Sequence, residues 1–384
     1  MNDKAKRTML FLLFAVLFLP MLQDSFSFVR SAPLNGYHQS AQDAHFTYSS
    51  WFDGSYWEQK SKYINDHPGF RADMVRGNNQ LDYSLFRKIR VGWKLIGDDS
   101  CLMQDTYVYS YLGRDYDGYG YISEKVRKLK AIQDTLAKAG RSLIFIYAPS
   151  KAYYYPEHFP QYLKDTARGI TNLAVYEHIG DSLGLNQVDF NSWLVSMKPT
   201  RKELLYPRQG FHWSEYASLL AADSLARYME HLKGIHMIHP VWHRIEHTTK
   251  PRYKDDDIAR SMNLIWPFTK ETFSYPEVQF KGGKATTKPN VLFVGDSFLF
   301  QWIYSGVMDN TYGNWQIWYY NRELINKQYD DDASKSLEQE YVAGQLSKAD
   351  YIVVMFTGPN LHNMGNDFVE KTYAYYFPLA SANM

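Results

Sequence analysis

Three short hydrophobic runs along the chain are typical of strands buried on both faces of a sheet. The runs cover 143–147, 291–294 and 351–356, and each is apolar at consecutive positions, as strands of parallel sheets are. A weaker run at 187–190 also precedes polar residues. These runs predict an α/β fold with a parallel sheet flanked by helices.

Helical patterns fill much of the chain between these runs. Ser123 is expected to cap a helix through about residue 139 that Gly140 ends, and a second helix is expected over 214–229. Residues 57–90 are expected to be helical with a break at 67–69, and a further helix is expected at 337–346.

Polar residues follow each of the three apolar runs directly. Lys151, Ser297 and Asn360 come after the first, second and third run, respectively. Ligands of open parallel sheets bind outside the carboxyl ends of the strands. The pattern alone therefore predicts a site at one sheet edge that includes these three residues.

The N-terminus has the features of a membrane-targeting segment. Lys4, Lys6 and Arg7 precede an apolar run at 9–22, which suits a signal peptide or an uncleaved signal anchor within 1–30. Either interpretation exports the rest of the chain. We expect an extended polar linker at 31–56 and one domain at 57–384, with an insertion at 235–290.

The charge balance and the cysteine content exclude several classes of protein. The 42 basic and 41 acidic residues give a net charge of +1, so no bulk field attracts nucleic acid. Cys101 is the single cysteine, which excludes an intramolecular disulfide and a cysteine-based metal cluster. The chain has neither a P-loop nor a G-x-G-x-x-G motif, and we expect no cofactor.

Gly295-Asp296-Ser297, directly after a buried run, is the leading catalytic candidate. A serine on a tight strand-to-helix turn is exposed, and main-chain N–H groups near it can bind an oxyanion. A serine nucleophile needs a base, and His212, which precedes a predicted helix, has the most suggestive setting.

A zinc site and a cation site are two alternatives to this serine site. His243 and His247 have the H-x-x-E-H spacing of a zinc peptidase, but Pro240 and the flanking residues do not predict the long helix that this motif needs. The acidic run 255–257 is expected to be a solvated turn rather than a cation site. We therefore expect no metal.

The order and spacing of several motifs give a more specific indication. The sequence resembles the periplasmic SGNH-hydrolase-like O-acetyltransferases of the AlgX/AlgJ type, which acetylate exopolysaccharides such as alginate. The resemblance covers roughly 55–365 and rests on NDHPGFR at 65–71, APSK at 148–151, YPE at 155–157, HWS at 212–214 and GDSF at 295–298.

The resemblance implies an SGNH-like fold and an O-acetyltransferase that acts outside the cytoplasm on a polysaccharide acceptor. Ser297 would be the nucleophile and His212 the general base, and Arg322 matches a substrate-binding arginine of the family. A multispanning membrane-bound O-acyltransferase would supply the acetyl groups as a partner, because this chain has no further spans of its own.

One departure from the family pattern leaves three alternatives open. The family's acid lies two residues before the histidine, where this chain has Gly210. Another acid could orient the histidine, with Asp296, Glu215 and Asp189 as candidates; a Ser–His dyad could act more slowly; or the site could bind polysaccharide without turnover. A carbohydrate esterase, with water as acceptor, would use the same Ser–His chemistry.

Overall fold

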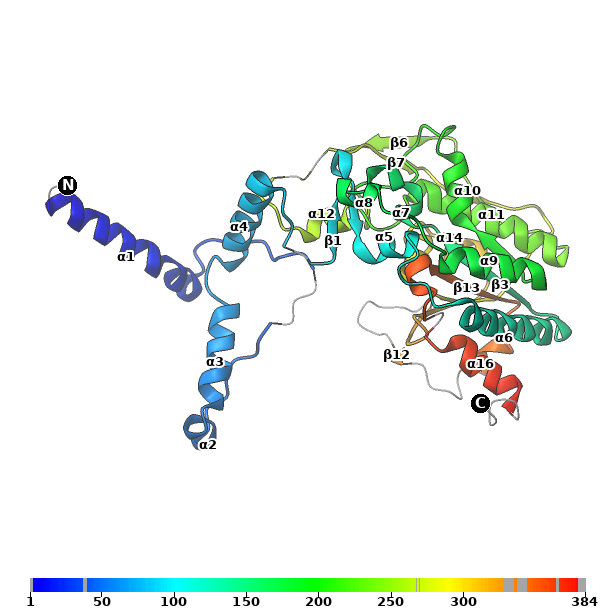
Figure 1. Cartoon of the computed structure of the whole chain (residues 1–384), viewed down its shortest axis with the longest axis horizontal. Coiled ribbons are helices and arrows are strands. Elements are labelled where there is room, and N and C mark those ends of the chain that lie inside the picture. Colours follow the sequence, from blue (N-terminus) through cyan, green and yellow to red (C-terminus); the bar gives the residue numbers. More distant parts are fainter. Residues whose placement is uncertain are drawn as a thin grey trace. The chain divides into compact units, whose positions relative to one another are not determined.

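The structure is a computed structural model that describes residues 3–36, 40–90, 92–266, 268, 270–326, 335–336, 344–363 and 366–378. The chain forms two compact units (Figure 1). The first unit comprises Met1–Gly92 and Ile258–Phe268, and the second comprises Trp93–Asp257 and Thr269–Met384. The predicted domain start at residue 57 therefore falls within the first unit.

The first unit consists of helices. They are α1 (Asp3–Phe26), α2 (Tyr48–Phe52), α3 (Ser55–Asp66) and α4 (Arg71–Phe86), and α12 (Asp257–Ser261) begins at the boundary between the units. Helix α1 is long and apolar enough to cross a membrane, with a mean hydropathy of 1.9. The helix break predicted at 67–69 lies between α3 and α4, whereas α2 falls in the segment expected to be an extended linker.

The second unit is built around a mixed, mostly parallel sheet, so the predicted α/β class is confirmed. The four apolar runs form its strands β3, β4, β9 and β13. The described strands have the spatial order β12-β11-β10-β9-β13-β3-β4, in which the two pairings that involve β11 are antiparallel and the others are parallel. The strands are β3 (Ser142–Ala148), β4 (Gln187–Asp189), β9 (Val291–Gly295), β10 (Trp315–Tyr319), β11 (Glu323–Asn326), β12 (Lys335–Ser336) and β13 (Tyr351–Thr357).

Helices cover both faces of this sheet (Figure 1). Alternate residues of β3 separate into two cores: Ile144 and Ile146 face one layer, whereas Leu143 and Phe145 face the other. The first layer contains α10 (Phe190–Met197), α11 (Glu215–Lys233), α13 (Phe300–Tyr304) and α14 (Val307–Thr311), and the second contains α6 (Tyr119–Lys138), α9 (Asn172–Leu183) and α16 (Phe368–Tyr376).

Two helices differ at one end from the ranges predicted from the sequence. Helix α6 begins at Tyr119, so Ser123 is a buried residue inside the helix and not its cap. The Ser214 side chain does cap α11, accepting a hydrogen bond from Ala217 N, and the helix continues to Lys233. The helix expected at 337–346 lies largely outside the described residues.

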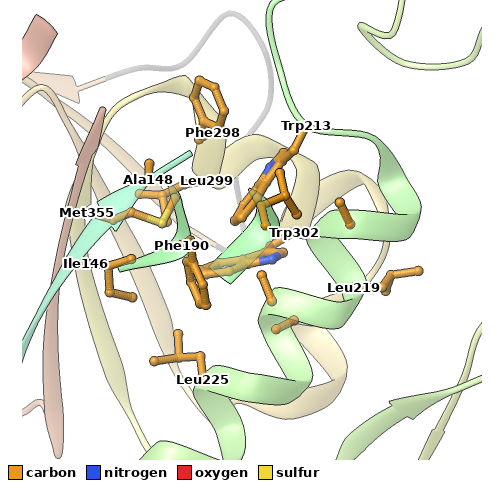
Figure 2. Packing of buried hydrophobic residues seen from close by; sticks show 14 of the residues in the cluster. Ile146, Ala148, Phe190, Trp213, Leu219, Leu225, Phe298, Leu299, Trp302 and Met355 are labelled. Atoms are coloured by element: carbon orange, nitrogen blue, oxygen red, sulfur yellow. The ribbon is translucent and has the colours of Figure 1, made fainter. Parts of the chain in front are cut away.

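The core next to α11 is aromatic. Trp213, the residue after His212, is fully buried and packs against Phe298 and Trp302, which follow β9 (Figure 2). Ring centroids in both pairs are 5.8 Å apart. The loop before α11 and the turn after β9 are therefore fixed against each other by packing.

The expected insertion forms two small antiparallel sheets. Strand β5 (His239–Val241) pairs with β8 (Gln279–Lys281), and β6 (Ile245–Thr248) pairs with β7 (Phe273–Pro276). The H-x-x-E-H motif lies at the start of β6 rather than on a helix.

Shorter elements complete the second unit. These are β1 (Lys94–Ile96), η1 (Asp98–Ser100), β2 (Leu102–Gln104), α5 (Asp105–Tyr111), α7 (Lys151–Tyr154), η2 (Pro156–His158), α8 (Gln161–Lys164), η3 (Ser297–Leu299) and η4 (Gly358–Asn360).

Candidate active site

Ser297 stands at the carboxyl end of β9, as the first residue of the short helix η3. The turn is tight because Gly295 packs closely against β13: a Cβ on Gly295 would lie 2.5 Å from Met355 O. Asp296 caps η3 by accepting a hydrogen bond from Phe298 N. The strand-to-helix turn predicted from the sequence is therefore present, with the serine at its start.

His212 lies beside Ser297, although the two residues are 85 positions apart in the chain. His212 Nε2 is 2.8 Å from Ser297 Oγ. The imidazole is largely buried, and its ring centroid is 4.9 Å from that of Phe298. The structure thus brings the predicted nucleophile and the predicted base into hydrogen-bond contact.

The other imidazole nitrogen contacts Asp257. His212 Nδ1 is 3.1 Å from Asp257 Oδ2, and the second carboxylate oxygen accepts a 2.8 Å hydrogen bond from Phe211 N. The expectation that 255–257 is a solvated turn was wrong, because Asp255 is almost fully buried and the Asp257 side chain is about one-fifth exposed. The acidic run supplies the carboxylate that this chain lacks at position 210.

The surroundings of Asp257 favour its ionised form. Burial alone would raise its pKa, but the hydrogen bond and charge of His212, the N–H of Phe211 and the Lys151 ammonium outweigh burial and hold the pKa below its usual range. An ionised carboxylate only accepts hydrogen bonds, so the proton of neutral His212 is on Nδ1. His212 Nε2 is then free to accept the Ser297 hydroxyl proton.

The main chain around Gly210 explains why the acid is not at the family's position. A Cβ on Gly210 would lie 2.4 Å from Asp255 O and 2.9 Å from Lys254 O. The segment that carries Asp257 therefore fills the space that a side chain at 210 would need.

None of the three acids considered from the sequence is the hydrogen-bond partner of His212. Asp189 caps α10 through Asn191 N and Ser192 N. Glu215 is in the first turn of α11, where burial raises its pKa to about 7. Asp296 accepts its hydrogen bonds from Phe298, Thr357 and Asn360 instead.

Asp296 and Asn360 link the catalytic turn to the neighbouring strand. Asp296 is buried, and its Oδ2 accepts hydrogen bonds of 2.9 Å from Thr357 N, Thr357 Oγ1 and Asn360 Nδ2. Asn360 is in η4, directly after β13. The predicted position of Asn360 at this sheet edge is correct, and its described contacts hold Asp296.

Lys151 holds the loop that carries His212. The side chain is buried, and Nζ donates hydrogen bonds to Leu102 O at 3.0 Å, Arg208 O at 3.2 Å and Gly210 O. Burial lowers the pKa of this lysine. Lys151 is thus at the expected sheet edge, and its described hydrogen bonds all go to main-chain carbonyls.

Arg322 is exposed in the turn between β10 and β11. Its main-chain N–H donates to Tyr319 O, and no described contact joins its side chain to Ser297 or His212. This turn follows β10, whose Tyr319 pairs with Gly295 at the end of β9, and the substrate-binding role of Arg322 stays a prediction. Within the described residues, no group of three or more His, Cys, Asp or Glu side chains is arranged to hold a metal.

Sequence reasoning missed Asp257, the residue that completes the hydrogen-bonded chain. A signal was present: the family's acid position is a glycine, and an acidic run lies in the expected insertion, 45 residues after the histidine. Only the fold of that segment shows which of its three aspartates faces His212.

The fold and the site define a class, namely α/β proteins with a hydrogen-bonded Ser–His–Asp chain at the carboxyl ends of parallel strands. The family model described as "SGNH hydrolase-like domain, acetyltransferase AlgX" matches residues 109–315, which is more than half of the chain. The chain belongs to this family. The resemblance inferred from the motifs is therefore confirmed, as is the SGNH-like fold.

Several solved structures are also similar to this chain. The O-acetyltransferase domain of Pseudomonas putida AlgJ is 14% identical, with a TM-score of 0.46, and the match covers 73% of this chain and 99% of that one. Pseudomonas aeruginosa AlgX is 13% identical with a TM-score of 0.40, covering 69% and 55%. Bacillus cereus PatB1 is 11% identical with a TM-score of 0.42, covering 70% and 97%. No curated protein matches the sequence.

Proposed function

We propose that the protein is an extracytoplasmic O-acetyltransferase that transfers acetyl groups to hydroxyls of an exported or cell-surface polysaccharide. The observation that carries this proposal is the hydrogen-bonded chain Ser297–His212–Asp257, with contacts of 2.8 and 3.1 Å, in a member of an acetyltransferase family. This arrangement suits a serine nucleophile with a base and an orienting acid.

In the first half of the reaction, Ser297 takes the acetyl group from a donor ester. His212 Nε2 accepts the hydroxyl proton while Ser297 Oγ attacks the acetyl carbonyl. Asp257 keeps the imidazole in the correct tautomer and stabilises the imidazolium. The bond between the carbonyl carbon and the donor oxygen then breaks, and His212 returns its proton to that oxygen.

The oxyanion of the tetrahedral intermediate needs a fixed hydrogen-bond donor. The main-chain N–H of Ser297 stands at the start of η3, has no described acceptor and is the proposed donor to this oxyanion.

In the second half of the reaction, a sugar hydroxyl loses its proton to His212 and attacks the acetyl carbon. The acetyl–serine bond breaks, and the proton returns to Ser297.

The apolar helix α1 supports a location at the outer side of the inner membrane. With Lys4, Lys6 and Arg7 near its start, the positive-inside rule keeps the N-terminus in the cytoplasm and exports the second unit. One span cannot carry acetyl groups across a bilayer, so a multispanning membrane-bound O-acyltransferase is proposed as the partner that delivers them.

The test uses the full chain in detergent with a chromogenic acetyl ester. We expect release of the chromophore and an acetyl adduct on Ser297 that mass spectrometry detects in peptides. Ser297→Ala and His212→Ala should lower turnover by about 10³-fold or more. Ser305→Ala is the matched control, because this buried hydroxyl has no described hydrogen-bond partner.

A polysaccharide acceptor and water lead to different products, which separates transferase from esterase. If acetate forms at the same rate with and without added oligosaccharide, and no acetylated sugar appears, the protein is an esterase. If Ser297→Ala retains full polymer acetylation in cells, both enzymatic functions are wrong.

A further inference from the structure

The turn that carries Asp257 is built around the hydroxyl of a tyrosine from another strand. Tyr275 lies in β7, is buried and reaches the 252–255 turn with its hydroxyl. The hydroxyl accepts a 2.6 Å hydrogen bond from Arg252 N and donates a 2.7 Å hydrogen bond to Asp255 Oδ2. Asp255 N also donates to Arg252 O at 3.1 Å. The two ends of this turn are therefore joined both by the main chain and through Tyr275.

Asp255 connects this turn to the loop of the catalytic histidine. Its carbonyl oxygen is the atom that leaves no room for a Cβ at Gly210, two residues before His212. Two residues further on, Asp257 N donates to Lys254 O at 3.2 Å, and the Asp257 carboxylate contacts His212. A displacement of Asp255 would therefore move the carboxylate that orients the imidazole.

The same turn packs against the helix that follows Ser297. The Tyr253 ring stacks on that of Tyr304 at the end of α13, with centroids 5.5 Å apart and planes 5° apart. Lys254 Nζ lies 5.3 Å from the centroid of the Phe300 ring, at the start of α13. The turn thus contacts the element of the nucleophile as well as the loop of the base.

The surroundings of Asp255 favour its neutral form. The side chain is buried, and its Oδ1 has no described hydrogen-bond partner. The titratable groups that face it are Tyr275 from β7, Glu215 from α11, Glu271 from the segment before β7, and Asp257 from its own segment. Burial and the three carboxyls raise the pKa of Asp255 to about 8, although the hydrogen bond from Tyr275 lowers it. Ionised Asp255 would therefore favour water over its present position.

We infer that Tyr275 and Asp255 are positioning residues of the active site, because their hydrogen bond fixes the turn that holds Asp257 against His212. While Asp255 is neutral, the turn stays in place and supports turnover. As the pH rises through about 8, Asp255 ionises, the turn shifts and Asp257 no longer orients His212. This inference rests on the proposed function and adds an alkaline limit to turnover, set by a residue outside the catalytic chain.

The first test is Tyr275→Phe in the full chain in detergent, with a chromogenic acetyl ester. The variant lacks both hydrogen bonds to the turn, so kcat should fall about 10- to 100-fold while KM changes by less than about twofold. Tyr312→Phe is the matched control, because Tyr312 is similarly buried and its hydroxyl has no described hydrogen-bond partner. Parental kcat in Tyr275→Phe, or equal losses in the two variants, would overturn the inference.

The second test is the pH profile of kcat, which a merely structural role would not change. In the parent, kcat should fall above about pH 8. In Asp255→Asn it should stay level to a higher pH, because the amide does not ionise and can still accept the hydrogen bond from Tyr275. Asp256→Asn, at the less buried neighbouring aspartate, should keep the parental profile. An alkaline fall in Asp255→Asn equal to that of the parent would contradict the role of Asp255.

The third test follows the contact between His212 and Asp257 without turnover. A proton in a short hydrogen bond between imidazole and carboxylate resonates downfield of the amide protons in NMR spectra, and His212→Ala identifies the signal by removing it. We expect Tyr275→Phe to lose this signal and Tyr312→Phe to keep it. A signal retained in Tyr275→Phe, or absent from the parent, overturns the inference whether or not the ester is turned over. The expected loss without an acetyl adduct on Ser297 rejects the proposed function alone.

Discussion

A Cβ on Gly210 would lie 2.4 Å from the carbonyl oxygen of Asp255, so a side chain at 210 and the present course of the 254–257 segment exclude each other. The same segment places Asp257 3.1 Å from His212. Gly210 and Asp257 therefore depend on each other: the missing side chain at 210 leaves the room that the segment carrying Asp257 occupies.

Asp257→Asn should lower the turnover of an acetyl ester by about 10³–10⁴-fold, because an amide can donate to His212 Nδ1 and favour the wrong tautomer. Steady-state kinetics with the purified full chain measure this turnover. Asp256→Asn removes the same charge one residue earlier and should keep turnover near that of the parent. Equal losses in both variants would show that the acidic run acts through its total charge and not through Asp257.

Gly210→Ala should reduce both stability and turnover, because the new methyl group pushes the 254–257 segment and Asp257 away. Overpacking of this kind costs about 1–3 kcal/mol in the free energy of unfolding. Denaturant unfolding and ester kinetics provide the two measurements. Gly283→Ala is the matched control, since a Cβ there meets no atom within 4 Å.

Restoring an acid at the family's position should not rescue the enzyme. In the double variant Gly210→Asp with Asp257→Asn, the new side chain has no room, and turnover should remain as low as in Asp257→Asn alone. Recovery of turnover would mean that the 254–257 segment moves easily and that the two acid positions are interchangeable.

Lys151→Met should destabilise the second unit and slow catalysis. Methionine has a similar length but leaves the carbonyls of Leu102, Arg208 and Gly210 without their donor, and each unsatisfied buried group costs about 1–3 kcal/mol. The loop before His212 then loses its support, so kcat should fall as well. The comparison is Lys164→Met, which removes a surface ion pair with Asp98 worth about 0–1 kcal/mol.

Asp255 should make the stability of the protein fall with rising pH. Burial raises its pKa to about 8 from an ordinary 3.8, so the neutral acid is favoured in the folded state. This contribution to stability is complete below about pH 4 and is lost as the pH rises through about 8. Thermal unfolding at pH 5 and pH 8.5 should therefore show a lower Tm at the higher pH.

Asp255→Asn should reduce that fall in Tm, because the amide does not ionise and can still accept the 2.7 Å hydrogen bond from Tyr275. Part of the fall should persist through Glu215, whose pKa is raised by burial to about 7. Asp165→Asn, at an exposed position, should leave the pH dependence as it is in the parent. If Tm falls equally with pH in the parent, in Asp255→Asn and in Asp165→Asn, Asp255 is not the cause of the fall.

Local patterns in the chain were enough to predict the framework of the fold. Consecutive apolar residues identified β3, β9 and β13, because a strand covered on both faces must be apolar at every position. Helix ends were less accurate: α6 begins at Tyr119, so Ser123 lies inside the helix and does not cap it.

The sequence by itself determined strands β3, β4, β9 and β13, the apolar N-terminal helix and the placement of Ser297, Lys151 and Asn360 at one sheet edge, because each depends on neighbours within a few positions. Tertiary structure alone decided that Asp257, rather than Asp189, Glu215 or Asp296, contacts His212. That contact joins segments 45 residues apart and requires the close approach of 254–257 to a glycine. Periodicity and capping act over one or two turns of chain, and so they carry no information about which distant segment packs into such a space.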